Sequence, residues 1–335
     1  MRALRNVNVD VKIRIGGKTM PKYVPINSTI IPRFAEVRTF LRLPNVKTTE
    51  DVDYAIIGIP FDTGTTFRTG ARFGPSAVRD ISVIVKPYNY VQDVNIAEVL
   101  SGVDYGDAPI ISGYSEDSLD IIEKTWQPIV DAGVIPIGVG GDHLVSLGEL
   151  RALAKKHGPL ALIQFDSHTD TVDTYFGKKY CHGTPFARAV EEGLIDLEHS
   201  IQIGIRSTFY TDHDVQDSKD LGFDVVTAFE MHDMGIDAVI ERVLERVGDR
   251  KAFLTFDIDF ADPVYAPGTG TPEVGGFTGV ECLKIVRSLR NVNFVGYDVV
   301  EVLPAFDSGQ ITALLASNLI FEFVSIVGYQ KKNKQ

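Results

Sequence analysis

From residue 53 onward, short runs of apolar residues alternate with segments in which apolar positions recur every three or four residues. The short runs are rich in Val, Ile and Phe with little polar alternation, which predicts strands covered on both faces. The periodic segments predict amphipathic helices. The predicted strands are 54–60, 134–139, 160–165, 201–205, 223–228, 252–257 and 293–299, and the predicted helices are 117–131, 144–157, 184–193, 236–247, 278–289 and 310–327, with another opening at 74–77.

This alternation predicts an α/β domain built on a mostly parallel sheet, with helices on both faces. Residues 1–50 lack a sustained period and mix Pro, Asn and Gly with isolated apolar positions, so we interpret them as an N-terminal arm or cap. No repeat, low-complexity tract or linker interrupts residues 51–330, which we assign to a single domain. We assign residues 331–335 to a polar tail.

The overall composition narrows the classes of partner. The net charge of −12 disfavours nucleic acid, because binding a polyanion needs a basic surface. An unbroken run of about 18 apolar residues is absent, and the start has no apolar stretch of signal-peptide length, so we expect no membrane span and a cytoplasmic protein. Cys181 and Cys282 are too few for a disulfide framework or a four-thiolate zinc site.

Acidic residues and histidines gather where four of the predicted strands end. In parallel sheets these carboxyl ends share one edge, and ligands bind there. If the chain stays extended beyond each strand, residues at positions i, i+2 and i+4 point the same way. The side chains brought together in this way are His143, Asp166, His168, Asp170, Asp257 and Asp259, and Glu301 follows the last strand.

So many carboxylates cannot share a cleft unless cations compensate their charge. Oxygen ligands with two imidazoles and no thiolate suit Mn²⁺, and imidazole also suits Ni²⁺, Co²⁺ or Fe²⁺. One ion would leave ligands unused, whereas two ions about 3.5–4 Å apart use all six groups and leave room for a bridging water. A lone Asp-x-Asp is most simply a turn cap, so the inference depends on several such stretches occurring together.

Three of these stretches resemble the signature sequences of the ureohydrolases, the family that contains arginase and agmatinase. They are residues 140–143 (Gly-Gly-Asp-His), 166–170 (Asp-Ser-His-Thr-Asp) and 256–259 (Phe-Asp-Ile-Asp). The resemblance implies the three-layer α/β/α arginase-deacetylase fold with about eight strands. It also implies a binuclear manganese site, with nickel used by some members.

Carried over by position, the resemblance implies a ligand set for each of two ions. The first ion would be held by His143, Asp166, Asp170 and Asp257, and the second by His168, Asp166, Asp257 and Asp259, so that Asp166 and Asp257 bridge them. His182 matches the proton-handling histidine of the family. Glu301 matches the carboxylate that holds the guanidinium group of the substrate.

The implied reaction is hydrolysis of a guanidino group to urea and an amine. A water shared by two divalent cations loses its proton near neutral pH and supplies a hydroxide nucleophile. Glu301 would orient the planar guanidinium by charge-assisted hydrogen bonds. Asp259 would help to stabilise the tetrahedral intermediate, and His182 would deliver a proton to the leaving amine.

Sequences on either side of His182, at 175–179 and 184–193, resemble the agmatinase and guanidinobutyrase branch. We therefore expect agmatine or a guanidino acid, such as guanidinobutyrate or guanidinopropionate, as the substrate. Specificity is expected from the loops 62–66, 171–181 and 207–216. In the second of these loops, Thr171 and Asp173 are expected to contact the substrate, and Thr-Val-Asp at 171–173 stands where arginases place an asparagine.

Other functions remain open at this point. One is nickel-dependent hydrolysis of free guanidine or of a small guanidine or biguanide derivative. Another is amide hydrolysis on the related deacetylase architecture, which uses one zinc ion and not two. A third is a non-catalytic partner subunit, which the intact ligand set disfavours. The resemblance also implies a homo-oligomer, either a trimer or a hexamer.

Overall fold

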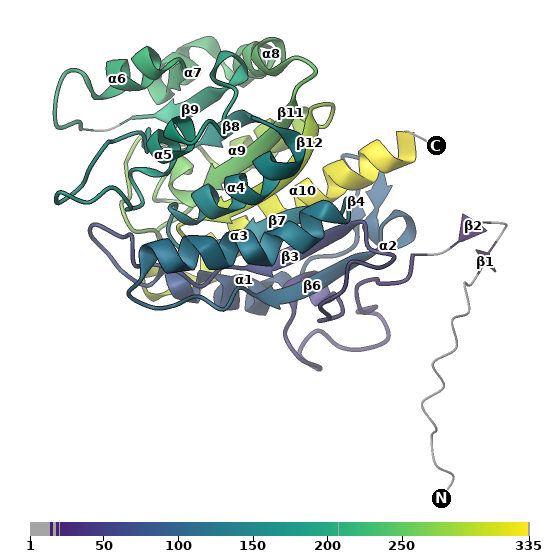
Figure 1. The fold of residues 1–335 in the computed structure, drawn as a ribbon. Helices are drawn as coiled ribbons and strands as arrows, with labels where there is room; N and C mark the ends of the chain where they lie inside the picture. The colour runs from purple at the N-terminus through teal and green to yellow at the C-terminus, as the bar shows by residue number, and fades with distance from the viewer. Residues whose placement is uncertain (1–13, 16–17, 20, 207, 334–335) are drawn as a thin grey trace, which may run out of the picture.

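Eight parallel strands form a central sheet in the computed structural model, which describes residues 14–15, 18–19, 21–206 and 208–333. The strand order is β10-β9-β8-β11-β12-β7-β3-β6, and each neighbouring pair runs parallel. Helices cover both faces of this sheet (Figure 1). The predicted three-layer α/β/α architecture with about eight strands is therefore confirmed.

Seven of the eight strands lie where the apolar runs predicted them. They are β3 (Tyr54–Gly58), β7 (Ile135–Val139), β8 (Ala161–Phe165), β9 (Ile201–Ile205), β10 (Asp224–Thr227), β11 (Lys251–Asp257) and β12 (Asn293–Val300). The eighth, β6 (Gly102–Asp107), is an edge strand that the sequence did not reveal, because two glycines and two aspartates interrupt its apolar pattern. Short antiparallel pairs are formed by β1 (Arg14–Ile15) with β2 (Lys18–Thr19) and by β4 (Tyr88–Asn89) with β5 (Val94–Asn95).

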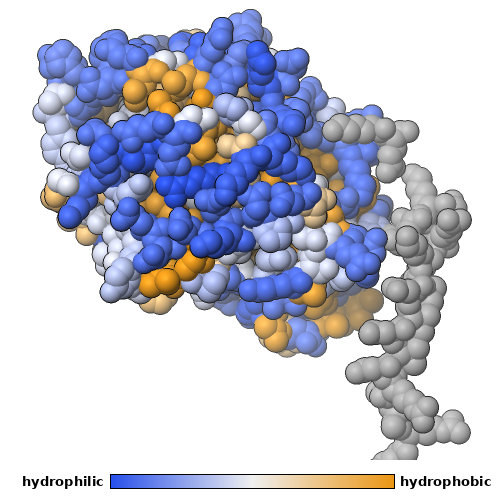
Figure 2. Space-filling view, viewed as in Figure 1, coloured by the Kyte–Doolittle hydropathy of each residue, from blue (hydrophilic) through white to orange (hydrophobic). Residues whose placement is uncertain are grey.

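Helices pack on the sheet in two layers. One layer contains α3 (Ser115–Asp131), α4 (Val145–His157) and α5 (Pro185–Glu191). The outer surface seen over α3 and α4 is mainly polar, as amphipathic helices require (Figure 2). The opposite layer contains α1 (Gly74–Ser82), α7 (Ala228–Met234), α8 (Ile236–Val247), α9 (Gly279–Ser288) and α10 (Ile311–Asn333).

Three short helices were not predicted. They are α2 (Ile96–Val99), α6 (Asp214–Leu221) and α7. Each has eight residues or fewer, so too few apolar positions recur for a helical period to be recognised. In α6 the sequence Asp-Val-Gln-Asp-Ser-Lys-Asp-Leu contains only two apolar residues.

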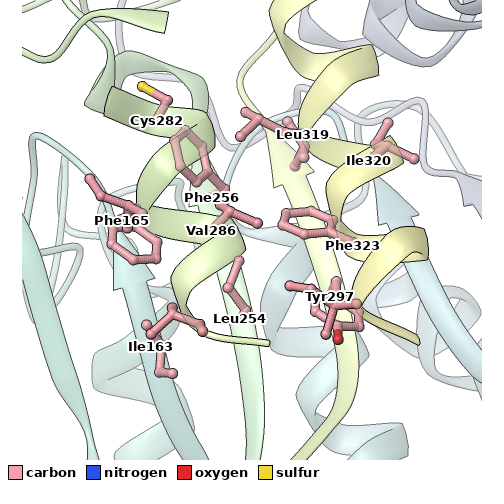
Figure 3. Packing of buried hydrophobic residues seen from close by; sticks show 14 of the residues in the cluster. Ile163, Phe165, Leu254, Phe256, Cys282, Val286, Tyr297, Leu319, Ile320 and Phe323 are labelled. Carbon is pink, nitrogen blue, oxygen red and sulfur yellow. The ribbon is translucent and has the colours of Figure 1, made fainter. Parts of the chain in front are cut away.

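Large side chains fill the space between the sheet and helices α9 and α10 (Figure 3). Phe165 of β8 and Phe256 of β11 have ring centroids 5.5 Å apart, and Tyr297 of β12 stacks on Phe323 of α10 at 4.8 Å. By length and mean hydropathy, the helical segment Ser308–Asn333 is apolar enough to cross a membrane, although the sequence shows no unbroken apolar run. Since 78% of its most apolar window is buried in this core, the segment serves as a core helix.

The last part of the expected N-terminal arm packs into the domain. Phe40, Leu41 and Leu43 are buried, and the backbone N–H of Phe40 donates to Asp104 Oδ2 at 3.0 Å. The Arg79 guanidinium of α1 lies 4.1 Å from the centroid of the Phe40 ring. This stretch therefore packs against α1 and against the edge strand β6.

Glu149 of α4 is a buried acid that is not in the proposed ligand set. Neither of its carboxylate oxygens has a hydrogen-bond partner among the described residues. Burial, followed by the negative charge of Asp298, raises the pKa of Glu149 well above its usual value. Folding therefore favours the protonated form of this carboxyl more than the unfolded chain does.

A stability test follows for Glu149. The unfolded chain releases this proton at a lower pH than the folded protein does. The contribution of Glu149 to the free energy of unfolding therefore decreases as pH rises above the ordinary carboxyl pKa. We expect Glu149→Gln to raise the thermal unfolding midpoint by several degrees at pH 8.5, with a difference that shrinks toward pH 5. The exposed Glu245→Gln serves as control and is expected to show no such trend. A difference between Glu149→Gln and wild type that does not vary with pH would contradict this account.

Candidate metal centre

Four adjacent strands, β8, β11, β12 and β7, end at the same edge of the sheet. Asp166 directly follows β8, Asp257 ends β11 and Glu301 directly follows β12. His143 lies four residues beyond the end of β7, after Gly-Gly-Asp. Because the strands are parallel neighbours, side chains far apart in the sequence meet here.

Three carboxylates surround Nδ1 of His143. Asp166 Oδ2 and Asp170 Oδ2 each lie 3.0 Å from it, and Asp257 Oδ2 lies 3.3 Å away. This nitrogen is buried and makes no hydrogen bond of suitable geometry with any described residue. The other ring nitrogen, Nε2, lies 2.8 Å from Thr255 Oγ1, which fixes the orientation of the ring.

His168 forms a second group with Asp259 and Asp166. Its Nδ1 lies 3.1 Å from Asp259 Oδ2 and 3.6 Å from Asp166 Oδ1. Asp166 thus presents one oxygen to each histidine. In both groups, His143–Asp166–Asp170 and Asp166–His168–Asp259, one ligand atom from each residue lies within 4.8 Å of the others.

The backbone aims these side chains differently from the extended conformation that we expected. Beyond β8 the chain bends, and Asp170 has a φ of 52°, in the left-handed region. Beyond β11, residues Ile258–Phe260 form a 3-10 turn in which Asp257 Oδ1 accepts a hydrogen bond from the Asp259 N–H at 2.9 Å. The expectation of strand-like alternation was wrong: turns closed by side-chain-to-backbone hydrogen bonds bring the carboxylates together.

The carboxylates of the cluster lie close enough together to change one another's pKa values. Burial, with the charges of Asp259 and Asp166, raises the pKa of Asp257 well above its usual value. Burial and the charge of Asp166 raise the pKa of Asp170 to about 6. Burial also opposes ionisation of Asp166, but its hydrogen bonds and charge interactions with His143 and His168 bring its pKa below the usual value. Divalent cations would relieve this repulsion, and the residues present therefore fit a metal centre.

His182 lies beside the cluster, held by contacts at both ring nitrogens. Nδ1 is 2.9 Å from Glu301 Oε1, and Nε2 is 2.7 Å from Thr66 Oγ1. Burial lowers the pKa of this imidazole, but the Glu301 hydrogen bond and the charges of Glu301, Asp142 and Asp170 raise it to about 9. The second oxygen, Oε2 of Glu301, is buried and has no hydrogen-bond partner within the described ranges.

The two expected substrate contacts from the loop 171–181 have different surroundings. Thr171 is half-buried directly after Asp170. Asp173 is exposed, and its carboxylate lies 2.7 Å from Arg188 Nη2, so its charge is already paired. In the same loop, the ring of Tyr175 lies 6.0 Å from the ring of Tyr210, measured between centroids.

Two residues that shape the site had no individual role assigned from the sequence, although Thr66 lies in the loop 62–66 that was expected to set specificity. Thr66 orients His182, and Asp142 Oδ2 accepts a hydrogen bond from the Gly64 N–H at 2.7 Å. Burial and the charge of Glu301 raise the pKa of Asp142 to about 8. The sequence position of residues 62–66 could have indicated such a role, because they follow β3, which ends on the same side of the sheet as the other strands.

Comparison with known proteins identifies the family. The model of the arginase family matches residues 52–325, which is most of the chain. The chain belongs to the arginase family. The suspected resemblance to the ureohydrolases is confirmed, and the protein is a hydrolase that acts on guanidino C–N bonds.

Similar proteins of the arginase family act on several guanidino compounds, as their names state. The chain is 41% identical over 304 residues to a guanidinopropionase of Pseudomonas aeruginosa, covering 90% of this chain and 95% of that protein. It is 40% identical over 306 residues to a guanidinobutyrase of the same organism, covering 90% and 96%. Its structure superposes on proclavaminate amidino hydrolase from Streptomyces clavuligerus with a TM-score of 0.86 and 36% identity, covering 89% of this chain and 99% of the other.

Proposed function

We propose that this protein is a binuclear-metal ureohydrolase that releases urea and an amine from a guanidino compound of the agmatine or guanidino-acid type. The observation that carries the proposal is the pair of ligand groups that share Asp166, one centred on His143 and the other on His168. The two groups share Asp166 and differ in their other members, so each offers a separate ligand set. Two ions with Asp166 and Asp257 between them use every carboxylate in the cluster.

The proposed ligands for the first ion are His143, Asp166, Asp170 and Asp257, and those for the second are His168, Asp166, Asp257 and Asp259. Carboxylate oxygens and imidazole nitrogens without thiolate favour Mn²⁺, and Ni²⁺ is the alternative. When bound, two such ions lower the pKa of a water between them and so supply a hydroxide nucleophile at neutral pH.

The remaining residues bind and orient the substrate. The free Oε2 of Glu301 would accept hydrogen bonds from the guanidinium and fix its plane. Oε1 of the same carboxylate already holds His182 at 2.9 Å, so Glu301 places the imidazole next to the bound guanidinium. The pKa of His182, raised to about 9 by Glu301 and the nearby carboxylates, favours the protonated imidazole, which can give its proton to the leaving amine.

We assign substrate choice to the same loops as the sequence indicates, 62–66, 171–181 and 207–216. Thr171 is retained as a proposed contact. For Asp173 we propose an indirect role, because its carboxylate is paired with Arg188 and holds the loop to α5. The Tyr175–Tyr210 contact joins two of these loops.

Measuring urea release from a panel of compounds tests the substrate class. With Mn²⁺-loaded or Ni²⁺-loaded protein, we expect 4-guanidinobutyrate, 3-guanidinopropionate or agmatine to be turned over with a kcat/KM at least about tenfold above that of arginine and of guanidine. The highest kcat/KM with free guanidine or a methylated biguanide would instead support the small-guanidine alternative. The absence of urea from every compound, with two ions bound, would support a non-catalytic partner subunit.

A homo-oligomer, either a trimer or a hexamer, also remains a proposal from the resemblance. Multi-angle light scattering on the full-length protein measures its mass directly. A monomeric mass of about 37 kDa would contradict it.

A further inference from the structure

Ser167 lies between two proposed ligands, Asp166 and His168, and is completely buried. Its backbone N–H and its hydroxyl both donate to Oδ1 of Asp259, at 3.0 and 2.8 Å. The other oxygen of Asp259, Oδ2, is buried without a hydrogen-bond partner among the described residues and lies 3.1 Å from His168 Nδ1. One oxygen of Asp259 is thus saturated by Ser167, while the other remains available to the His168 group.

The Ser167 hydroxyl carries a single proton and has two neighbours that could receive it. Its Oγ lies 2.8 Å from Asp259 Oδ1 and 3.1 Å from His168 Nδ1. A hydrogen bond to a carboxylate is charge-assisted and therefore stronger than one to neutral imidazole. The proton is thus directed to Asp259, which leaves the lone pair of His168 Nδ1 free for a cation.

Buried Arg206 fixes the main chain of the same residue. Its Nη2 donates to the carbonyl oxygen of Asp259 at 2.6 Å and to that of Glu273 at 2.8 Å. Asp259 is therefore held at its backbone by Arg206 and at its side chain by Ser167. These contacts, together with the hydrogen bond from the Asp259 N–H to Asp257 Oδ1, fix the position of Asp259.

We infer that Ser167 is a positioning residue for the ion on the His168 side alone. This inference rests on the proposed binuclear site and adds to it a residue outside the ligand set. In the first group, Asp166, Asp170 and Asp257 approach His143, whose ring is oriented by Thr255, and Ser167 has no hydrogen bond to Asp170, Asp257 or His143 within the described chain. Loss of the hydroxyl therefore weakens one site and leaves the other intact. Removing such an outer hydrogen bond typically costs 10- to 100-fold in metal affinity.

The test is to measure Mn²⁺ binding to metal-free Ser167→Ala by isothermal titration calorimetry. Metal analysis after dialysis gives the number of ions retained per chain. Wild type is expected to bind two ions per chain. In Ser167→Ala we expect one affinity to be unchanged and the other to fall by about 10- to 100-fold. Ser146→Ala is the matched control, because this buried hydroxyl donates to Asp298, which is not a proposed ligand. Both affinities of the control are expected to match those of wild type.

Two unchanged affinities in Ser167→Ala, or equal weakening of both, would overturn the inference. If Ser167→Ala fails to fold, as judged by circular dichroism, Ser167→Gly removes the same hydroxyl and carries the same expectation. Ser167→Thr keeps a hydroxyl and is expected to retain both ions. If Ser167→Thr and Ser167→Ala both lost the same single ion, that result would also count against the inference. A wild type that binds a single ion would contradict the proposed function itself, and is thereby distinguished from a failure of the Ser167 role.

Discussion

Asp257→Ala is expected to lose both metal ions and to lower urea release by at least about a thousandfold, the effect of removing roughly 4 kcal/mol of transition-state stabilisation. The reason is its position between the two groups. Oδ2 of Asp257 lies 3.3 Å from His143 Nδ1, and Oδ1 accepts the hydrogen bond that turns Asp259 toward His168. Removing this carboxylate therefore disturbs both groups at once. Metal analysis and a urea assay on the same preparation measure the two effects.

Asp170→Ala provides the contrast for this prediction. Asp170 approaches His143 at 3.0 Å and belongs only to the first of the two ligand groups. We expect this variant to keep the ion on the His168 side and to lose the other. If Asp257→Ala retained wild-type activity, or lost only one ion as Asp170→Ala does, the proposed bridging role of Asp257 would be incorrect.

His182→Ala is expected to have the opposite signature, with both ions retained and turnover reduced by about 10²- to 10⁴-fold. His182 contacts Glu301 and Thr66 but is in neither ligand group, so metal binding does not depend on it. Its proposed task is to deliver a proton. Single-turnover urea release together with metal analysis separates this effect from that of Asp257→Ala.

The pH dependence of activity provides a second measurement on His182. Its pKa is raised to about 9 in the folded protein, so the imidazole is protonated below that pH and loses its proton as pH rises through it. Bound cations repel an imidazolium, so we expect activity to fall on the alkaline side at or below pH 9. This limb is expected to disappear in His182→Ala and to persist in the control His199→Ala, whose ring pairs with Asp196 on the surface. An unchanged limb in His182→Ala would assign it to another group.

Prediction from sequence worked best where a feature is local. Strands β7, β8 and β11 are runs of apolar residues buried on both faces, and burial alone dictates that pattern. The edge strand β6 and the polar helix α6 were not predicted. An element at the edge of the sheet or packed shallowly on the surface needs fewer apolar residues, so its sequence pattern is weaker. The packing of the N-terminal stretch around Phe40 was not predicted for a related reason. Its apolar residues are isolated and do not recur at a regular spacing, although they are buried beside α1.

The sequence by itself determined which residue types stand at the ends of the parallel strands, since polar residues such as Asp166 and His168 directly after a buried run have little reason to be there other than chemistry. It also identified the family through three short stretches. Only the tertiary structure decided how those side chains meet, because that depends on turns such as Ile258–Phe260 and on hydrogen bonds between distant segments. The contacts of Ser167 with Asp259 and of Thr66 with His182 join residues 92 and 116 positions apart, and no local pattern encodes such distances.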